Sequence, residues 1–484
     1  MGSVVLLRLS GEVSTKARAT RRAFVVRLAK NVRDALASEG IEGAVVRRHE
    51  RILVESSDAR APGLLTRVFG VQSVSRAERH PVASLEALVA LAAGRFREAV
   101  RGRRFAVRAR HVGDARLPFR GRDVEVALGA ALREVSAGVD LDHPEVTARV
   151  ELFEGHAYLF GEALPGQGGL PLGTGDRAVA LVSGGFDSAV AAWQLLRRGV
   201  LLDFVFVNLG GLTHRLGGLR VMEVLARRWC YGARPHLHVV DFAAVSQQLQ
   251  TQVEARYRQV VLKRLMLRAA EAVARATRAR AIVTGDAVGQ VSSQTLANIA
   301  TISEATRLPI LRPLVGANKD EIIAAANRIG TGPLSAAVGE YCALVPRRPA
   351  TQARLEAVLA EEAKLEPALL DAAVALREIL DLRELAEDAS ALADLEVREI
   401  PADAVVIDLR SRAEYQTWHW PGALQLDFSK AVEAYPSFSK DRSYALYCEY
   451  GLKSAHLAEL MRRHDLRACH VRGGTATLRK LAAR

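Results

Sequence analysis

The hydrophobic positions at the start of the chain predict a small unit of strands and helices. Apolar runs at residues 3–10, 44–48 and 51–55 have the length of strands. Over residues 15–38 an apolar residue recurs every four positions, which predicts a helix with a buried stripe of Phe24, Leu28, Val32 and Leu36. A short helix at residues 61–68 completes the order strand, helix, strand, strand, helix. This order predicts a ferredoxin-like fold for residues 1–78.

A second α+β unit is predicted for residues 79–165. Helices at 84–101 and 123–135 accompany a strand at 104–110 and a hairpin of residues 146–153 and 156–162. The first strand alternates apolar and basic positions, so one face carries Arg104, Arg108 and Arg110. A solvated strand face and a surface for nucleic-acid phosphates both fit this pattern, and we predict RNA binding for these three arginines.

Residues 166–176 contain five glycines and no apolar periodicity, which predicts a linker. Strands and helices then alternate through residues 177–387, including a helical stretch at 245–278 in one or two pieces and Ala-, Leu- and Glu-rich helices over 351–387. This alternation predicts a doubly wound parallel sheet, which binds ligands beyond the carboxyl ends of its strands. Residues 400–484 begin a further α/β unit.

The first strand of the predicted parallel sheet ends in the string SGGFDS, from Ser183 to Ser188. Its two glycines let the backbone approach an anion closely, and the unpaired N–H groups at the start of the following helix point at that anion. We expect Ser188 to cap this helix. Asp187 would repel a bare phosphate, so its carboxylate predicts a bridging Mg²⁺. A tight turn without a ligand is the alternative, although the full string favours nucleotide phosphates.

Polar residues elsewhere can complete a nucleotide site. Asn208 ends one predicted strand, Gly285 follows another, and Gln294 comes a few residues later. Lys263 lies on a helix between apolar neighbours, where a surface lysine with a buried stem is the alternative. Lys319 opens a helix, where a solvated first-turn charge is the alternative. An ammonium group at either place can offset phosphate charge.

The C-terminal unit carries a cysteine between a predicted strand and a predicted helix. The strand at 444–447 ends in the string CEYGLKS, from Cys448 to Ser454. Loop N–H groups and the helix dipole stabilise a thiolate or persulfide anion at such a place. A buried, inert cysteine is the alternative, but the spacing Cys-x-x-Gly-x-x-Ser favours a catalytic loop.

Composition adds information on charge and compartment. The 484 residues carry a formal net charge of +13, which favours a polyanionic partner such as nucleic acid, although a GC-rich genome also raises arginine content. Four cysteines are too few for a secreted disulfide scaffold, so we expect a cytoplasmic protein. No apolar run has the length of a membrane span, so we expect no membrane partner.

Several of these strings resemble known domains. SGGFDS resembles the pyrophosphate loop, or PP-loop, of the ATP pyrophosphatases, and no Gly-Lys-Ser/Thr follows it as in a Walker loop. FAVRARHVGD and VDLDHPEVTARVEL resemble a THUMP domain, the RNA-binding module of tRNA-modifying enzymes, and residues 400–484 resemble a rhodanese domain. Together with NLGG, LKRLMLRAA, VTGDAVGQVSSQTLANI and EYC, they resemble the tRNA 4-thiouridine synthetases, or tRNA sulfurtransferases.

The resemblance implies a multidomain α/β protein that uses ATP to move persulfide sulfur to a tRNA uridine, at position eight, through adenylation of the C4 oxygen. It implies a cysteine desulfurase as sulfur donor and sulfur delivery to the thiamine sulfur-carrier protein. We also expect a homodimer, although the sequence does not give the oligomeric state. Lys319 matches a lysine that the family needs for activity. The residues matched to ATP binding are Leu181, Val182, Ser183, Gly184, Gly185, Asp187, Ser188, Lys263, Gly285 and Gln294, to which we add Asn208 from its strand-end position.

The resemblance also implies roles for the cysteines. It makes Cys342, whose role the residues alone leave open, the partner of a transient disulfide with the persulfide-bearing Cys448. Cys230 and Cys469 are interpreted as core residues. Tyr450 departs from the many rhodanese loops that carry Arg at its position, which should weaken binding of a free anionic sulfur donor. The alternative function is a rhodanese sulfur carrier for thiamine biosynthesis without tRNA modification, and the basic strand face argues against it.

Overall fold

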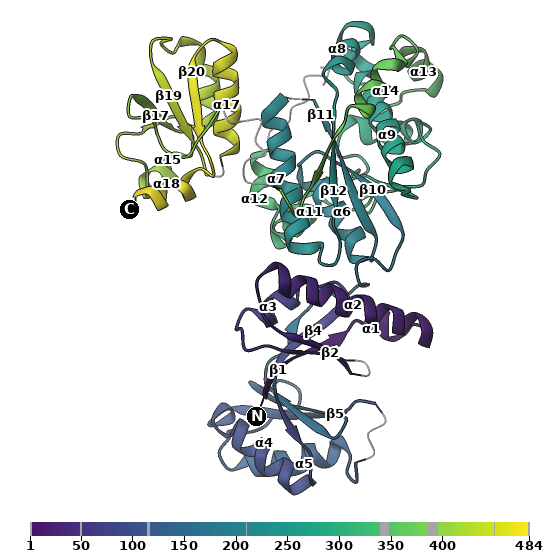
Figure 1. The fold of residues 1–484 in the computed structure, drawn as a ribbon, viewed down its shortest axis with the longest axis vertical. Helices are drawn as coiled ribbons and strands as arrows, with labels where there is room; N and C mark the ends of the chain where they lie inside the picture. Colours follow the sequence, from purple (N-terminus) through teal and green to yellow (C-terminus); the bar gives the residue numbers. More distant parts are fainter. Residues whose placement is uncertain are drawn as a thin grey trace. The chain divides into compact units, whose positions relative to one another are not determined.

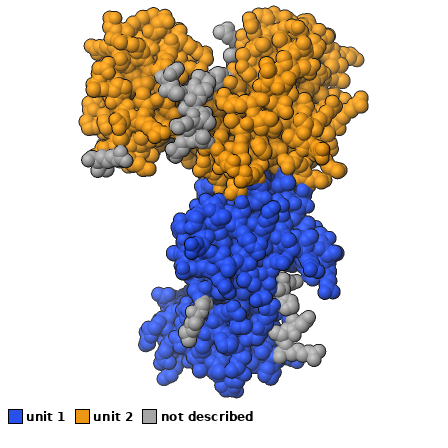
Figure 2. Space-filling model, in the orientation of Figure 1, with its two compact units in different colours: residues 1–175, 196–201, 228–233 blue, residues 176–195, 202–227, 234–484 orange. Residues whose placement is uncertain are grey.

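A computed structural model describes residues 2–48, 51–113, 117–209, 211–338, 348–385, 395–449 and 451–482. The chain divides into two compact units, coloured blue and orange in Figure 2. The first contains residues 1–175, 196–201 and 228–233, and the second contains 176–195, 202–227 and 234–484. Across the described ranges, every helix is too short or too polar to cross a membrane.

One nine-stranded sheet runs through the first unit (Figure 1). Its order is β2 (Ala44–Arg48), β3 (Arg51–Glu55), β1 (Gly2–Leu9), β4 (Val71–Pro81), β8 (His156–Phe160), β7 (Val146–Phe153), β5 (Arg104–His111) and β6 (Gly138–Val139), with β9 (Leu164–Pro165) paired to β4. The sequence did not predict β4, because its burial does not alternate regularly. β4 is antiparallel to both β1 and β8, so the expected boundary at residues 78 and 79 lies inside a continuous sheet.

Among the described residues, five helices accompany this sheet: α1 (Gly11–Ser14), α2 (Arg18–Ser38), α3 (Ala61–Leu65), α4 (Leu85–Val100) and α5 (Gly121–Arg133). The predicted helix at 15–38 therefore begins three residues late, after the separate turn of α1. Its apolar stripe is confirmed, since Leu28, Val32 and Leu36 are buried in one core and Phe24 packs against that core. The hydroxyl of Ser84 accepts a hydrogen bond from the backbone N–H of Ala87 and so caps α4.

The second unit contains the predicted doubly wound sheet. Its order is β14 (Ile310–Leu311), β13 (Ile282–Val283), β10 (Arg177–Val182), β11 (Leu201–Asn208), β12 (His236–Asp241) and β15 (Glu378–Asp381). β11 and β12 lie on one side of β10 and β13 and β14 on the other, so the strand order reverses at β10. A ligand site is therefore expected at the carboxyl end of β10. The prediction of helix throughout residues 351–387 is wrong at β15, which instead pairs antiparallel with the edge strand β12.

Nine helices of the described residues belong to this domain: α6 (Phe186–Arg197), α7 (Gly211–Trp229), α8 (Ala243–Gln252), α9 (Arg258–Thr277), α10 (Leu296–Ser303), α11 (Lys319–Ile329), α12 (Gly332–Ala337), α13 (Leu355–Glu362) and α14 (Pro367–Ala375). The helical stretch predicted at 245–278 is confirmed as two pieces, α8 and α9. A buried ion pair ties α9 to α13, because Nε of Arg264 lies 2.8 Å from a carboxylate oxygen of Glu362.

A separate five-stranded parallel sheet forms the C-terminal domain, with the order β16 (Glu396–Val397), β20 (Arg467–Val471), β19 (Ser443–Tyr447), β17 (Ala404–Asp408) and β18 (Leu424–Gln425). Its helices are α15 (Arg412–Thr417), α16 (Phe428–Ala434), α17 (Leu452–Arg463) and α18 (Thr475–Ala482). The strand and helix predicted on either side of the cysteine loop are confirmed as β19 and α17.

His238 on β12 should make the second unit sensitive to acid. Its side chain is buried, and Nδ1 accepts a hydrogen bond of 3.3 Å from Nε of Arg377. Burial, with the Arg377 charge, lowers the pKa of His238 to about 4 from 6.5. As the pH falls, His238 is therefore protonated in the unfolded chain at a higher pH than in the folded protein. The stability contributed by neutral His238 is full above pH ~6.5 and is lost toward pH ~4, by at most about 3 kcal/mol.

We expect the thermal midpoint to fall less between pH 7 and pH 5 in His238→Gln than in the wild type. The exposed His143 provides the control, since His143→Gln should keep the wild-type pH dependence. An unchanged pH dependence in His238→Gln would show that this imidazole does not contribute.

Candidate nucleotide and sulfur-transfer sites

The predicted phosphate loop lies at the point where the strand order of the six-stranded sheet reverses. Ser183, Gly184 and Gly185 form the turn between β10 and α6. The prediction that Ser188 caps the helix is wrong, because α6 already includes it. The Ser188 hydroxyl instead turns back into the loop, where it accepts a 3.3 Å hydrogen bond from the Ser183 N–H and donates one of 3.3 Å to the Gly185 carbonyl. This serine therefore closes the loop on itself.

One pocket beside the loop collects most of the predicted nucleotide-binding residues. It is lined by Leu181, Val182, Ser183, Asp187, Ser188, Lys263, Met266, Leu267, Thr284, Gly285, Asp286, Gln294 and Ile302. Gly184 and Gly185 lie in the adjoining turn, and Asn208 ends β11 outside this lining. The lining combines an apolar wall with hydroxyl, ammonium, carboxylate and carboxamide groups, which is the composition expected of a small-ligand site.

Gly285 allows the end of β13 to approach the phosphate loop. A Cβ atom at this position would lie 2.7 Å from both the carbonyl carbon of Asp187 and the backbone nitrogen of Ser188. Both neighbours are backbone atoms of α6, so a larger residue would displace the loop itself. The glycine thus brings two segments about a hundred residues apart to one site.

Asp187 is held by two donors from other segments. The ammonium of Lys319 lies 2.9 and 3.1 Å from the two carboxylate oxygens, and the amide nitrogen of Gln290 donates a hydrogen bond of 2.9 Å. Lys319 is the first residue of α11, whose N-terminus is fixed by a capping box of Asn318 and Glu321. The ammonium of Lys319 therefore contacts the phosphate loop, while its side chain stays partly exposed to solvent. The sequence did not single out Gln290.

Asp286 is a site residue to which the sequence assigned no role of its own. One carboxylate oxygen lies 2.9 Å from the ammonium of Lys263, and the other accepts hydrogen bonds from Thr284 at 2.8 Å and from Arg312 at 3.4 Å. Burial would raise the pKa of Asp286, but the Lys263, Thr284 and Arg312 interactions outweigh it and lower that pKa to about 2. The ionised carboxylate fixes Lys263 at the pocket, so the alternative of a surface lysine does not describe it.

Two buried acceptors near the loop have no hydrogen-bond partner in the described part of the chain. They are Oε1 of Gln294, which lines the pocket, and Oδ1 of Asn208 at the end of β11. Buried oxygens are normally satisfied, so each of these atoms is available to a donor on a ligand. The two lysines and the N-terminus of α6 add positive charge. This donor set fits a nucleotide polyphosphate.

Cys448 directly follows β19 and precedes α17. Its side chain is 4% exposed, and Sγ lies 3.5 Å from the hydroxyl of Ser454, which in turn donates to the Gly451 carbonyl at 3.1 Å. The Cys448 carbonyl accepts a hydrogen bond of 3.1 Å from the Thr475 N–H. The first and last residues of the predicted Cys-x-x-Gly-x-x-Ser loop are thus in contact. Tyr450 lies outside the described residues.

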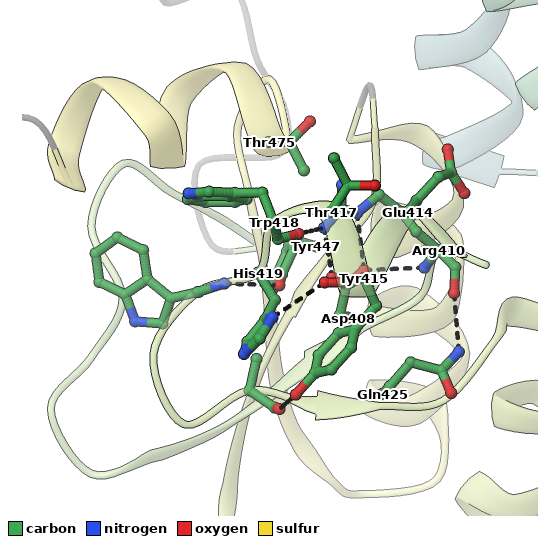
Figure 3. A network of polar contacts seen from close by, with 12 residues as sticks. Asp408, Arg410, Glu414, Tyr415, Thr417, Trp418, His419, Gln425, Tyr447 and Thr475 are labelled. Carbon is green, nitrogen blue, oxygen red and sulfur yellow. Dashed lines mark hydrogen bonds and ion pairs between the residues drawn. The ribbon is translucent and has the colours of Figure 1, made fainter. Parts of the chain in front are cut away.

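A buried ion-pair network, drawn in Figure 3, lies at the end of β17. The guanidinium of Arg410 binds both carboxylate oxygens of Asp408, at 3.0 and 2.6 Å, and donates to the Trp418 carbonyl at 2.6 Å. Its remaining nitrogen lies 3.7 Å from the carboxylate of Glu449. The network therefore connects the end of β17 to the residue that follows Cys448.

The structure describes two of the other three cysteines. Cys342 lies outside the described residues, so its predicted pairing with Cys448 stays a prediction. Cys230 is buried, as predicted for a core residue. Cys469 is only half-buried in β20, with its thiol 3.5 Å from the Tyr444 carbonyl.

The predicted arginine face of β5 is partly engaged within the unit. Arg104 forms an exposed ion pair of 3.4 Å with Asp140. Arg149 on β7 stands opposite Arg108 in the strand register. Burial, followed by the charges of Arg108 and Arg110, lowers the pKa of Arg149, which marks a local excess of positive charge. The sequence could not indicate Arg149, because its position depends on how β7 pairs with β5.

These features define a class of protein: a cysteine-dependent transferase with a nucleotide pocket, preceded by α+β units that present a basic face. Family models match each part of the chain. The model of the ThiI ferredoxin-like domain matches residues 4–75, the THUMP domain 82–162, the thiamine biosynthesis protein (ThiI) 173–366, and the rhodanese-like domain 391–479.

Curated relatives identify the family. The chain is 35% identical to a tRNA sulfurtransferase of Desulfurococcus amylolyticus over 98% of each chain, and 34% identical to that of Marinobacter nauticus over 93% and 95%. It belongs to the tRNA sulfurtransferase family and is an enzyme of that kind. A crystal structure of a 4-thiouridine synthetase–RNA complex with bound ATP superposes with a TM-score of 0.68 at 28% identity, covering 78% of this chain and 99% of that one. The predicted resemblance and fold class are thereby confirmed.

Proposed function

We propose that this tRNA sulfurtransferase uses ATP to adenylate the C4 oxygen of a tRNA uridine, at position eight, and then replaces that oxygen with persulfide sulfur from Cys448. The observation that carries the proposal is one pocket lined by Lys263 and by Asp187 of the α6 N-terminus, with Lys319 bound to Asp187, in a chain that also holds the Cys448 loop. The bound ATP and RNA of the similar 4-thiouridine synthetase support ATP and tRNA as ligands here.

The nucleotide pocket suits transfer of an adenylyl group. Attack of the uridine oxygen on the α-phosphorus releases pyrophosphate, so negative charge grows on the departing oxygens. The N–H groups of α6, together with Lys263 and Lys319, lie where they can stabilise that charge. Asp187 is the residue that would hold Mg²⁺ together with the phosphates, and a bound Mg²⁺ would neutralise phosphate charge. The product carries AMP as a leaving group on C4.

The sulfur step uses the two cysteines. The terminal sulfur of the Cys448 persulfide attacks C4, AMP leaves, and a disulfide joins the uridine to Cys448. The Cys342 thiolate then attacks the Cys448 sulfur, which frees 4-thiouridine and leaves a Cys342–Cys448 disulfide. A reductant must open this disulfide before the next turnover. The persulfide itself requires a donor, for which we propose a cysteine desulfurase.

The proposal has further parts. They are a homodimer, sulfur supply for the thiamine thiazole through the rhodanese domain, which rests on the family resemblance, and a cytoplasmic location, which rests on the small number of cysteines. We also keep the domain bounds 1–78, 79–165, 177–387 and 400–484, with 166–176 as linker. A sulfur carrier that does not modify tRNA remains the competing function, and the test below separates the two.

The test is thiolation of an unmodified tRNA transcript by the purified protein with ATP, Mg²⁺, cysteine and a cysteine desulfurase. We expect 4-thiouridine, detected by its near-ultraviolet absorbance, only when ATP is present. A transcript lacking the uridine at position eight is the control and should stay unmodified. Sulfur that loads onto Cys448 without reaching the tRNA would overturn the proposal in favour of the sulfur carrier.

The basic face of β5 should contribute to tRNA affinity. Replacing Arg108 and Arg110 by Gln removes two charges that can contact phosphates, so we expect roughly tenfold weaker binding near 0.1 M salt and a logarithmic salt slope smaller by about 1.5. The measurement is a salt titration by filter binding or fluorescence anisotropy. Arg60→Gln, which removes an exposed arginine paired with Asp58, should leave the slope unchanged. Equal slopes for both variants would remove this strand face from the RNA surface.

A further inference from the structure

The charged side chains that border the pocket over Cys448 are mostly acidic. In the C-terminal domain they are Arg410, Glu414, Asp427, Glu449 and Lys453. This composition is unexpected in a domain that carries a net positive charge, with more Lys and Arg than Asp and Glu over residues 395–484. The charged residues that line the pocket are therefore mostly acidic, whereas the domain as a whole carries a net positive charge.

Two of the five charges are balanced by their neighbours. Arg410 binds both oxygens of the fully buried Asp408, as drawn in Figure 3, and its own side chain is 4% exposed. Asp427, the N-cap residue of α16, lies 3.3 Å from the ammonium of Lys430 on that helix. Arg410 also lies 3.7 Å from the carboxylate of Glu449, but its charge is already matched by Asp408. Two carboxylates, on Glu414 and Glu449, are then left with one exposed ammonium, on Lys453.

Both remaining carboxylates are held in place by hydrogen bonds. Glu414 accepts hydrogen bonds from the backbone N–H and hydroxyl of Ser411, at 2.9 and 2.6 Å, and these bonds lower its pKa. Glu449 is the residue after Cys448, and its carboxylate accepts a hydrogen bond of 3.1 Å from the Thr475 hydroxyl. The Glu449 side chain is still 47% exposed, so its charge acts on any molecule that enters the pocket.

Sulfur donors differ in the charge that they bring to such a pocket. With thiosulfate, the Cys448 thiolate attacks the outer sulfur, the S–S bond breaks, and sulfite leaves with both negative charges of the donor. With a protein persulfide, the thiolate attacks the outer sulfur and the donor cysteine leaves as a thiolate. Both reactions move one sulfane sulfur atom without an added oxidant or reductant. They differ because thiosulfate must bring a dianion past the two carboxylates.

We propose that Glu449, assisted by Glu414, makes this pocket selective for sulfane sulfur carried on a protein cysteine and excludes small anionic donors such as thiosulfate. The inference rests on the proposed sulfur-carrying role of Cys448. We describe Glu449 as a specificity-determining residue and not as a catalytic one, because the transferred sulfur bonds to Cys448 and not to the Glu449 carboxylate.

The test compares two donors on the full-length protein. Persulfide on Cys448 is measured by mass spectrometry after exposure to thiosulfate or to a cysteine desulfurase with cysteine, and thiosulfate turnover is followed as thiocyanate formed with cyanide. Glu449→Gln keeps the shape and can keep the Thr475 hydrogen bond, while it removes the charge. We expect its kcat/KM for thiosulfate to rise about tenfold, with the gain shrinking in high salt. Lys453→Gln should lower the same constant.

The matched control is Glu433→Gln, which removes an exposed carboxylate of α16 outside the pocket lining and should leave thiosulfate turnover unchanged. Loading from the desulfurase should stay within about twofold in all three variants. Equal thiosulfate turnover in the wild type and Glu449→Gln, or a wild type that loads equally fast from both donors, would overturn the selectivity alone. If neither donor loads Cys448, the sulfur-carrying role fails and the inference fails with it.

Discussion

The Cys448→Ser variant should form no detectable 4-thiouridine, a loss of at least about a thousandfold, while it retains ATP–pyrophosphate exchange in the presence of tRNA. Oxygen cannot accept sulfane sulfur to form a persulfide, so the sulfur step loses its carrier. We propose that adenylation takes place in the pocket beside β10, and none of the described residues that line this pocket belongs to the C-terminal domain. Serine is close to cysteine in size, and the Ser454 contact and the backbone hydrogen bond to Thr475 can persist. The two activities should therefore separate in one variant.

The control is Cys469→Ser in the same domain. The Cys469 thiol is half-buried and lies near the Tyr444 carbonyl, to which a serine hydroxyl can also donate. This variant should keep wild-type thiolation. Thiolation that survives in Cys448→Ser would move the persulfide to another residue, and loss of pyrophosphate exchange would indicate that the cysteine loop also shapes the nucleotide pocket.

The sequence predicted those parts of the two sites that are contiguous in the chain. The string SGGFDS and the loop from Cys448 to Ser454 each combine a strand end, a tight turn and a helix start, and such local geometry depends on a few adjacent residues. Parallel-sheet topology could be predicted for the same reason, since strand and helix periods alternate along residues 177–387. The resemblance then supplied roles that no pattern contains, including the assignment to Cys342.

The parts that were missed depend on tertiary pairing. Asp286 joins Lys263 on α9 to Arg312 beyond β14, and nothing in the local sequence sets those distances. Arg149 faces Arg108 only because of the strand register. β15 forms because the edge of β12 is available to pair, which outweighs the helical propensity of the surrounding residues. Ser188 satisfies groups inside its own loop, so the usual preference of serine for the cap position does not apply.

Asp187→Asn should lower adenylation, measured by pyrophosphate exchange, by about a thousandfold or more, while Cys448 still accepts sulfur from the desulfurase. The substitution keeps the side-chain size but removes the charge that we propose holds Mg²⁺ with the phosphates. The Asp187–Lys319 ion pair is partly exposed on both sides, and such pairs contribute no more than about 1 kcal/mol to stability. The thermal midpoint should therefore change little. Asp176→Asn, at an exposed ion pair with Arg280, is the matched control and should retain full exchange.

The double variant Asp187→Asn/Lys319→Met distinguishes a chemical role from a structural one. If the two residues only neutralise each other, the single variants suffer from an uncompensated charge, and removing both charges should restore much of the exchange activity. If both act on the triphosphate, as we propose, the double variant should be at least as inactive as either single variant. Recovery to within about tenfold of the wild type would contradict the proposed site. Sustained inactivity with an unchanged thermal midpoint would place both side chains in contact with the reacting phosphates.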